Sequence, residues 1–333
     1  MKLAIVVPCY NEQEVLAETS RRLLLVLQRL KRLNHVSKDS HIYLVDDGSS
    51  DDTWQLIEPM TRAHDEIQGI KLSRNYGHQS ALLAGLFNAD GDAIISIDAD
   101  LQDDVEVIDE MVSAAKKGAD IVYGVRRERE FDTPFKRRTA LGFYRLMSML
   151  GINIVANHAD YRLMSRRVIE HLKQFEEVNL FLRGLVPLLG FKTEKVYYSR
   201  TERFAGETKY PLKKMLGFAW DAITSFSVDP LRLNTVIGYI TALTSVPLTM
   251  WVLAVKYLFD AAIPGWASTV LPLYFLGGIQ LIAIGVIGEY LGKMYKEVKR
   301  RPRFIVETVA GGYSMLQSVN GKQAIYVSEE EII

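Results

Sequence analysis

The sequence predicts an α/β domain with a mostly parallel sheet, followed by a segment that associates with a membrane. Short apolar runs alternate with segments of helical periodicity through the first part of the chain, which is typical of parallel strands covered by helices. Polar residues gather directly after several of these runs, where ligands bind in open α/β sheets. Two long stretches with almost no charged residues follow towards the C-terminus.

The predicted strands are short and apolar. Residues 3–7 form a continuous apolar run that ends at Pro8, as expected of a buried parallel strand that leads into a loop. Similar runs lie at residues 42–45, 70–72, 93–97 and 120–123. Segments with helical spacing lie between the runs, at residues 12–33, 79–88 and 105–117.

Composition excludes several classes of protein. The 333 residues include 40 Lys and Arg and 40 Asp and Glu, so the net charge is zero, whereas a nucleic-acid-binding domain is usually strongly basic. The single cysteine, Cys9, rules out an internal disulfide framework and a multi-cysteine metal site. The apolar run at residues 3–7 is shorter than the roughly 7–15 apolar residues of a signal peptide. We therefore expect the N-terminal domain to remain in the cytosol and to bind no nucleic acid.

Two segments have the length and composition of transmembrane helices. Residues 235–259 contain a single charge, Lys256, and residues 267–288 contain none, and about 20 apolar residues suffice to cross a bilayer. Basic residues lie on both outer flanks and are absent from the connection at 260–266. The positive-inside rule then places both flanks in the cytoplasm, with a short hairpin on the other side. The alternative is a pair of buried core helices.

The segment before the first span also suits a membrane surface. Residues 211–228 interleave basic residues with large apolar residues, which is typical of an amphipathic helix on the cytoplasmic leaflet; a surface helix of the domain is the alternative. The predicted organisation is a domain at 1–210, an amphipathic juxtamembrane segment at 211–232, a two-helix transmembrane hairpin at 233–292 and a basic cytoplasmic tail at 293–333.

The motif Asp98-Ala99-Asp100 is a candidate metal site. It follows the predicted strand at 93–97, and residues two apart in an extended chain point to the same side, so Asp98, Asp100 and Gln102 would share one face. Carboxylate oxygens suit Mg²⁺ or Mn²⁺, which bridge to substrate phosphates and neutralise the charge on a departing diphosphate. Acidic loops are common, so the motif alone is weak evidence for a metal site. Its position directly after a predicted buried strand strengthens that interpretation.

Two further polar clusters follow other predicted strands. Asp46 and Asp47 end the run at 42–45, and Asp47 is placed to accept a hydrogen bond from a base N–H or a ribose hydroxyl. The residues at 50–53 have a simpler explanation, since they suit a turn and a helix cap. At the end of the first strand lie Pro8, Tyr10, Asn11 and Glu12.

Together the segments PCYNE at 8–12, VDDGSSDDT at 45–53 and DADLQDD at 98–104 resemble the inverting family 2 glycosyltransferases, over about residues 2–210. The resemblance implies a GT-A fold, which is Rossmann-like, and a nucleotide-sugar donor. It implies that the nucleoside is held by Pro8, Tyr10, Asn11, Glu12 and Asp47. It likewise implies that the diphosphate and the metal are held by Asp98, Ala99, Asp100 and Gln102.

The segment SRNYGHQSAL at 73–82 resembles the part of these enzymes that lies beside the nucleotide. This resemblance implies donor contacts from Asn75, Gly77 and Gln79. His78 lies in the same segment and has two interpretations, a catalytic base or a loop histidine that bonds backbone groups. We favour the second.

Clustered cations point to an anionic acceptor. Six cations fall within residues 126–138 and a second set lies within 200–211, and each set precedes sequence suited to a membrane. A charge run is usually a solvated face, but this placement favours capture of a lipid headgroup. The candidate phosphate-binding residues are Arg126, Arg138, Arg200, Arg203 and Lys209.

The pattern R-x-x-R-x-x-G-x-[ST]-K-Y from residue 200, then two spans, then KRRPRFIVE from residue 299, resembles the polyprenyl-phosphate glycosyltransferases. The bacterial and phage undecaprenyl-phosphate glucosyltransferases are the most similar in appearance, and dolichyl-phosphate mannose synthases are more distant. The resemblance implies inverting transfer of one hexose, with glucose from UDP-glucose as the preferred donor, to undecaprenyl phosphate for later lipopolysaccharide modification. It implies a multi-pass protein of the bacterial inner membrane with both termini in the cytoplasm.

The motif HADYRLMSRR at 158–167 resembles the same group, where the position of Asp160 is a catalytic carboxylate. Asp160 and Asp100 are therefore the expected catalytic residues. A phosphate monoester is already mostly ionised at neutral pH, since its second pKa is about 6. Whether Asp160 removes a proton, orients the phosphate or stabilises a developing oxocarbenium ion stays open at this point.

Other functions agree less well with the sequence. A polymerising polysaccharide synthase would carry a Gln/Arg-x-x-Arg-Trp motif and more spans, and neither is found. A non-enzymatic membrane subunit that senses nucleotides is the second alternative. A nicotinamide-binding domain is disfavoured because no G-x-G-x-x-G follows a predicted strand.

Gly288-x-x-x-Gly292 suits close helix packing, so we expect a homo-oligomer.

Overall fold

The protein is described by a computed structural model, covering residues 1–127, 158–178, 181–199, 224, 227–258 and 266–311. Its centre is an eight-stranded sheet in the order β7-β5-β6-β4-β1-β2-β3-β8. Four strands form the parallel middle: β1 (Leu3–Cys9), β2 (His41–Asp46), β3 (Ile67–Leu72) and β4 (Ala93–Ser96). The predicted α/β fold with a mostly parallel sheet is therefore confirmed.

The remaining strands extend this sheet on both sides. β6 (His158–Ser165) runs antiparallel to both β4 and β5 (Ile121–Arg126), and β7 (Thr193–Tyr198) runs parallel to β5. At the opposite edge β8 (Val306–Ala310) pairs antiparallel with β3. The sequence did not predict β6, β7 or β8, because no long apolar run marks them.

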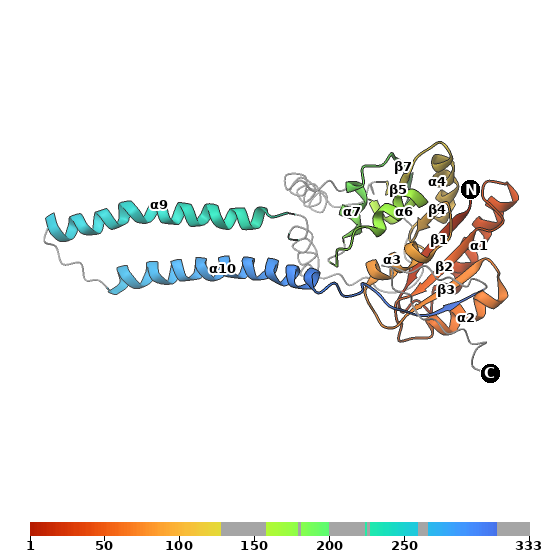
Figure 1. The fold of residues 1–333 in the computed structure, drawn as a ribbon, viewed down its shortest axis with the longest axis horizontal. Coiled ribbons are helices and arrows are strands. Elements are labelled where there is room, and N and C mark those ends of the chain that lie inside the picture. Colours follow the sequence, from red (N-terminus) through yellow and green to blue (C-terminus); the bar gives the residue numbers. More distant parts are fainter. Residues whose placement is uncertain (128–157, 179–180, 200–223, 225–226, 259–265, 312–333) are drawn as a thin grey trace.

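Helices cover both faces of the sheet (Figure 1). Alternate residues of β1 face opposite cores, with Leu3, Ile5 and Val7 in one and Ala4 and Val6 in the other. The first core is closed by α1 (Leu16–Arg32), α2 (Thr53–Ala63) and, after the short 3₁₀ turn at Val105–Val107, α4 (Ile108–Lys116). The second is closed by α3 (His78–Asn88), α6 (Arg166–Lys173) and α7 (Leu182–Leu188).

The helix predicted from residue 12 begins later, at Leu16. Asn11 has a φ of 54°, in the left-handed region, which turns the chain out of β1. The carbonyl oxygen of Glu12 then accepts hydrogen bonds from the N–H groups of Val15 and Leu16. A turn therefore separates β1 from α1 and places residues 10–14 at the carboxyl edge of the sheet.

The helix α3 packs closely on the sheet because it contains Gly85. A Cβ atom at this position would lie 2.2 Å from Cγ1 of Val6 and 2.9 Å from Cγ2 of Val45. Both neighbours are β-branched and stiff, so the space cannot open easily. The close approach seats the second half of α3 directly on β1 and β2.

Two long helices, α9 (Asp229–Leu258) and α10 (Trp266–Val298), run side by side away from the sheet (Figure 1). Within the described residues, one stretch, Phe275–Val298 of α10, has the length and hydropathy of a membrane span. Its apolar side chains are exposed, as for Leu281 and Ile282. The predicted second span remains a prediction, as does the division of the chain into four regions.

The C-terminal part differs from the expected basic tail. The helix α10 continues without a break through residue 292 and ends at Val298, and the chain then returns to the sheet as β8. Residues 306–310 therefore belong to the sheet of the domain. The amphipathic segment expected at 211–228 lies almost entirely outside the described residues.

We expect the substitution Leu27→Ala to lower the free energy of unfolding by about 2–4 kcal/mol, because it leaves a cavity in a packed core. Leu27 is fully buried on α1, whereas Leu25 on the same helix is 51% exposed. The matched variant Leu25→Ala should therefore change stability by less than about 0.5 kcal/mol. Urea denaturation of the full-length protein, followed by tryptophan fluorescence, measures both, and equal losses would contradict this assignment of the core.

Candidate active site

The carboxyl ends of β1 and β2 meet at one point on the sheet edge. Cys9 pairs with Asp46 in the register, and the N–H of Asp47 donates to the carbonyl oxygen of Cys9 at 2.9 Å. Tyr10 follows directly and is 47% exposed. Pro8, by contrast, is buried within β1.

The loop after β2 is tied to the loop after β1 by Asn11. The Oδ1 atom of Asn11 accepts a hydrogen bond from the N–H of Ser50 at 2.9 Å, and its own N–H donates to Oγ of Ser49 at 3.0 Å. The N–H of Glu12 donates to Oγ1 of Thr53 at 2.9 Å. The predicted nucleoside-binding residues Tyr10, Asn11, Glu12 and Asp47 therefore do lie together, with the two loops holding each other in place.

Asp47 organises the next loop. Its carboxylate is buried and accepts hydrogen bonds from the N–H groups of Tyr76 at 2.8 Å and Gly77 at 2.9 Å. Burial raises the pKa of Asp47, while these two donors act in the opposite direction. The donor-site candidates Asn75 and Gly77 are thus held beside Asp47, and α3 begins directly after them.

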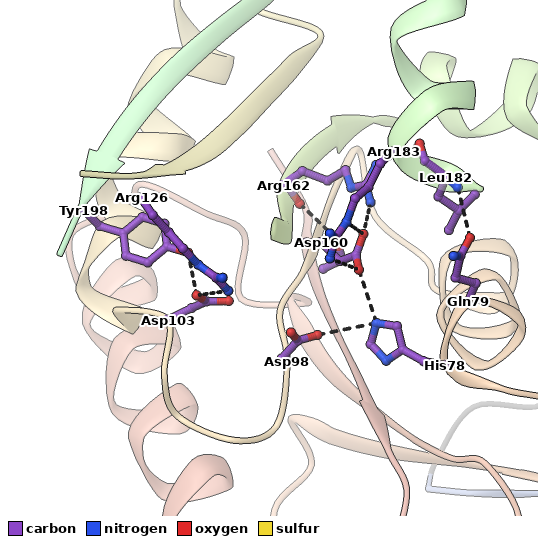
Figure 2. A network of polar contacts seen from close by, with 11 residues as sticks. His78, Gln79, Asp98, Asp103, Arg126, Asp160, Arg162, Leu182, Arg183 and Tyr198 are labelled. Carbon is purple, nitrogen blue, oxygen red and sulfur yellow. Dashed lines mark hydrogen bonds and ion pairs between the residues drawn. The ribbon is translucent and has the colours of Figure 1, made fainter. Parts of the chain in front are cut away.

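His78, the first residue of α3, lies between two carboxylates (Figure 2). Its Nε2 atom is 3.5 Å from Oδ1 of Asp98 and 3.5 Å from Oδ2 of Asp160. Burial lowers the pKa of His78, but its hydrogen bond to Asp160 and the charges of both carboxylates outweigh that effect and raise it. The favoured interpretation, a loop histidine that bonds backbone groups, was therefore wrong.

The motif at 98–100 is a turn rather than extended chain. β4 ends at Ser96, and Leu101 has a φ of 56°, so the expected alternation of Asp98, Asp100 and Gln102 along one face does not apply. The turn is anchored by Thr19, whose hydroxyl donates to the carbonyl oxygen of Ala99 at 2.6 Å. The extended geometry expected of this motif was therefore wrong, whereas metal binding by Asp98, Asp100 and Gln102 stays a prediction.

The surroundings of Asp98 disfavour its ionised form. Its side chain is 32% exposed, but its Oδ1 atom is buried and has no hydrogen-bond partner among the described residues. Burial raises the pKa of Asp98 to about 6; the charge of His78 opposes this rise, and Asp160, Asp103 and Asp100 add to it. A buried carboxylate oxygen without a donor is a natural position for a cation.

Asp160 enters the site from β6. Because β6 runs antiparallel to β4, Ser96 pairs with Arg162, and Asp160 falls beside the turn that follows β4. The hydroxyl of Ser96 donates to the carbonyl oxygen of Asp160. This pairing brings Asp160 and Asp98, which are far apart in the sequence, to the same Nε2 atom of His78 (Figure 2).

Two arginines bind the Asp160 carboxylate (Figure 2). Nη2 of Arg162 lies 2.5 Å from Oδ1, and Nη2 of Arg183 lies 3.2 Å from Oδ2. Burial alone would raise the pKa of Asp160, but the hydrogen bond to His78 and the charges of Arg162 and Arg183 hold it well below its ordinary value. Asp160 is therefore a stable anion, and a weak base.

Comparison with known proteins places this site in a family. The sequence profile described as "Glycosyl transferase family 2" matches residues 4–173. The uncharacterized glycosyltransferase YkoT of Bacillus subtilis is 52% identical over 92% of this chain and 91% of its own length. The chain belongs to glycosyl transferase family 2. The predicted membership is confirmed, and the mostly parallel α/β fold is the GT-A-like fold expected of this family.

Other similar proteins carry more specific names. The prophage bactoprenol glucosyl transferase homolog of Escherichia coli K12 is 40% identical over 93% of this chain and 99% of its own length. A solved structure of glucosyl-3-phosphoglycerate synthase from Mycobacterium tuberculosis, in complex with Mn²⁺, UDP-glucose and phosphoglyceric acid, is 18% identical over 67% of this chain and 77% of that chain, with a TM-score of 0.43.

The predicted acceptor residue Arg126 binds within the protein. In this glycosyltransferase Nη2 of Arg126 lies 3.2 Å from Oδ1 of Asp103, and Nε donates to the hydroxyl of Tyr198 at 3.2 Å (Figure 2). Tyr198 also donates to Asp103, whose side chain is almost fully buried. Arg126 thus ties the 98–104 segment to the ends of β5 and β7. The other candidates lie outside the described residues: Arg138, Arg200, Arg203 and Lys209.

Gln79 also has a different partner from the one expected. Its Oε1 atom accepts a hydrogen bond from the N–H of Leu182 at 3.0 Å, and Nη1 of Arg162 donates to the carbonyl oxygen of Leu182 at 3.2 Å. Gln79 therefore links α3 to α7, and its contact with a nucleotide stays a prediction. The sequence reasoning missed Arg162 and Arg183. Arg162 shares the motif and strand face of Asp160, whereas nothing in the sequence marks Arg183.

The donor set suits a divalent metal only in part. Within the described residues no group of three or more His, Cys, Asp or Glu side chains gathers at one point. Mg²⁺ and Mn²⁺ sites often use one or two carboxylates and take their remaining ligands from phosphates and water. Asp98, with its buried Oδ1, and the neighbouring Asp100 fit a site of that kind.

We expect the Asp98→Asn variant to be more stable than the wild type above pH 6 in the presence of EDTA. The folded-state pKa of about 6 exceeds the ordinary value of 3.8, so the unfolded chain loses this proton first and stability falls as pH rises through that window. Asparagine removes the effect, and we expect a melting temperature about 2–4 °C higher at pH 7.5.

The gap should narrow as the pH falls from 6 and close below about pH 3.8, where Asp98 is protonated in both states. Thermal unfolding of both proteins at several pH values measures this difference. The exposed Asp65→Asn variant serves as the control and should follow the wild type. A gap that does not change with pH would show that the Asp98 charge is not the cause.

Proposed function

We propose that this glycosyltransferase transfers glucose from UDP-glucose, with inversion, to undecaprenyl phosphate at the cytoplasmic face of a bacterial inner membrane. The observation that carries the proposal is the placement of the Asp160 anion, 3.5 Å from a histidine that also reaches Asp98. A candidate catalytic carboxylate and a candidate diphosphate turn thus share one site. Relatives that are 38–40% identical over at least 92% of this chain carry the name bactoprenol glucosyl transferase, which supports the acceptor and the sugar.

The donor half of the site is built by the loops after β1, β2 and β4. We assign the nucleoside to Tyr10, Asn11 and Asp47, and the diphosphate to the turn at 98–100. Asp98 and Asp100 would hold Mg²⁺ or Mn²⁺, which supplies positive charge to the departing diphosphate. His78 lies at the same place, with its Nε2 atom 3.5 Å from Oδ1 of Asp98.

The acceptor half is built around Asp160. Because the arginines keep its pKa low, Asp160 is poorly suited to remove a proton, and a phosphate acceptor does not need that step. We assign Asp160 an orienting and electrostatic role at the anomeric carbon. Arg183 is 45% exposed, and its Nη1 group makes no hydrogen bond to the described residues. It is therefore placed to bind a phosphate oxygen while it holds Asp160.

Two rivals from the sequence remain to be compared. Membership in the family excludes the non-enzymatic nucleotide sensor. A polymerising synthase would extend a glycan instead of transferring one sugar to a lipid phosphate, and the names of the relatives favour the lipid acceptor.

We further propose that α9 and α10 both cross the membrane, with both termini in the cytoplasm. Exposed glycines of α10, such as Gly288 and Gly292, would pack against a second copy.

The proposal is tested by incubating the full-length protein in nanodiscs with undecaprenyl phosphate, Mg²⁺ or Mn²⁺ and a panel of nucleotide sugars. We expect a lipid-linked hexose from UDP-glucose, with loss of product when EDTA removes the metal. Mass spectrometry of the lipid extract identifies the sugar. Product from another nucleotide sugar would correct the donor, transfer only to a growing glycan would favour the synthase, and no transfer would overturn the proposal.

We expect Asp160→Asn to reduce kcat at least about 100-fold, because the site loses a charge that acts in the transition state. The donor site lies on the other side of His78, so the affinity for UDP-glucose, measured by calorimetry, should change less than about threefold. Asp120→Asn is the control, since Asp120 bonds Arg167 and Ser165 away from this edge. Near-normal turnover by the Asp160 variant would remove Asp160 from the mechanism.

A further inference from the structure

The end of α10 contacts the catalytic domain next to the active-site helix α7. Glu297, near the last turn of α10, accepts hydrogen bonds from the N–H of Val178 on both of its oxygen atoms, at 3.0 and 2.9 Å. Val178 lies in the connection between α6 and α7. A carboxylate that accepts a backbone N–H makes a charge-assisted hydrogen bond, which is stronger than a neutral one.

A second contact secures the same connection. Nη1 of Arg303 donates to the carbonyl oxygen of Phe175 at 2.8 Å, and its guanidinium lies 5.5 Å from the centre of the Phe87 ring on α3. Just beyond it, the carbonyl oxygen of Ile305 accepts the N–H of Ser73 at 3.0 Å, and β8 follows. The segment at 297–305 is therefore fixed to three parts of the domain: the connection after α6, the last turn of α3 and the end of β3.

The described residues after this connection contact Asp160 and its partners. A few residues beyond Val178, Leu182 accepts a hydrogen bond from Arg162 through its carbonyl oxygen and donates its N–H to Gln79. The next residue is Arg183, which binds Asp160. A short covalent path thus joins the N–H that Glu297 holds to the guanidinium that holds Asp160.

We propose that the cytoplasmic end of α10 is a positioning element of the active site, with Glu297 as its positioning residue. By fixing Val178, Glu297 sets where α7 begins and hence where Arg183 meets Asp160. Displacements of about 1 Å in a catalytic group lower rates strongly. The inference rests on the proposed role of Asp160 in transfer. It makes the helix that carries the candidate membrane span a part of the catalytic apparatus as well as an anchor.

Two substitutions at Glu297 distinguish the effect of its side-chain length from the effect of its charge. Glu297→Gln keeps the length of the side chain and one acceptor oxygen, and we expect at least half of the wild-type kcat. Glu297→Asp keeps the charge but withdraws the carboxylate by one methylene, and we expect kcat to fall roughly tenfold, with an unchanged KM for the nucleotide sugar. Glu307→Ala is the matched control, since Glu307 pairs with Lys71 at the far edge of the sheet, and it should keep wild-type kinetics.

A double-mutant cycle tests the route through Arg183. If Glu297 acts by positioning Arg183, the Glu297→Asp change should have almost no further effect in a protein that already carries Arg183→Ala. Equal losses in both backgrounds would show that Glu297 acts elsewhere and would overturn the proposal. Wild-type kcat in Glu297→Asp, or a tenfold loss in Glu297→Gln, would overturn it as well.

Amide hydrogen exchange provides a readout that does not depend on the assigned reaction. In Glu297→Asp we expect faster exchange at Val178 and at residues 181–184, and unchanged exchange in β1 and β2. Unchanged exchange at 181–184 would overturn the positioning role whatever the enzyme transfers. If exchange rises as expected but no nucleotide sugar supports transfer by the wild type, the proposed function fails and the contact between α10 and α7 stands.

Discussion

The antiparallel pairing of β6 with β4 is the contact on which the rest of the site depends. The parallel strands β1, β2 and β4 bring their carboxyl ends to one edge. A catalytic group on a further parallel strand would arrive at that edge only from a loop. Because β6 runs the other way, it delivers Asp160 from within the strand itself, opposite the turn that carries Asp98. Strand backbone therefore fixes the position of Asp160, while Asp98 is held by the turn that follows β4.

This arrangement concentrates charge in a partly buried place. Arg162 is fully buried, and its charge is balanced by Asp160 beside it. Asp98 pairs with no arginine in the part of the chain that the structure describes, and burial raises its pKa. Asp160 thus has a low pKa and favours its ionised form. Asp98 has a raised pKa, and a bound cation would stabilise its ionised form. His78 lies between them and is the group through which the two halves of the site interact.

Local patterns in the sequence were sufficient for the parallel half of the sheet and for the position of Asp98 at its edge, but not for the turn at 98–100. Buried parallel strands appear as apolar runs, and polar residues after such runs converge because parallel strands end at the same edge. The left-handed backbone of Asn11, which delays α1, leaves no signal beyond the residue type. The interaction of Arg183 with Asp160 depends on where α7 docks, and that position is set by contacts between distant segments. Such contacts are invisible to periodicity.

The last strand of the sheet has a consequence for how the chain is made. β8 comes after α10 in the sequence but covers the edge of β3, which belongs to the first quarter of the protein. Until the ribosome has synthesised residues 306–310, β3 is an uncovered edge, of the kind that pairs with other chains and aggregates. The domain therefore cannot complete its sheet before α10 has been synthesised, so the catalytic fold is finished only after the helix with the candidate membrane span. The order of synthesis thus sets the order of the two events, and a chain that stops short of β8 would keep an uncovered β3 edge that favours aggregation.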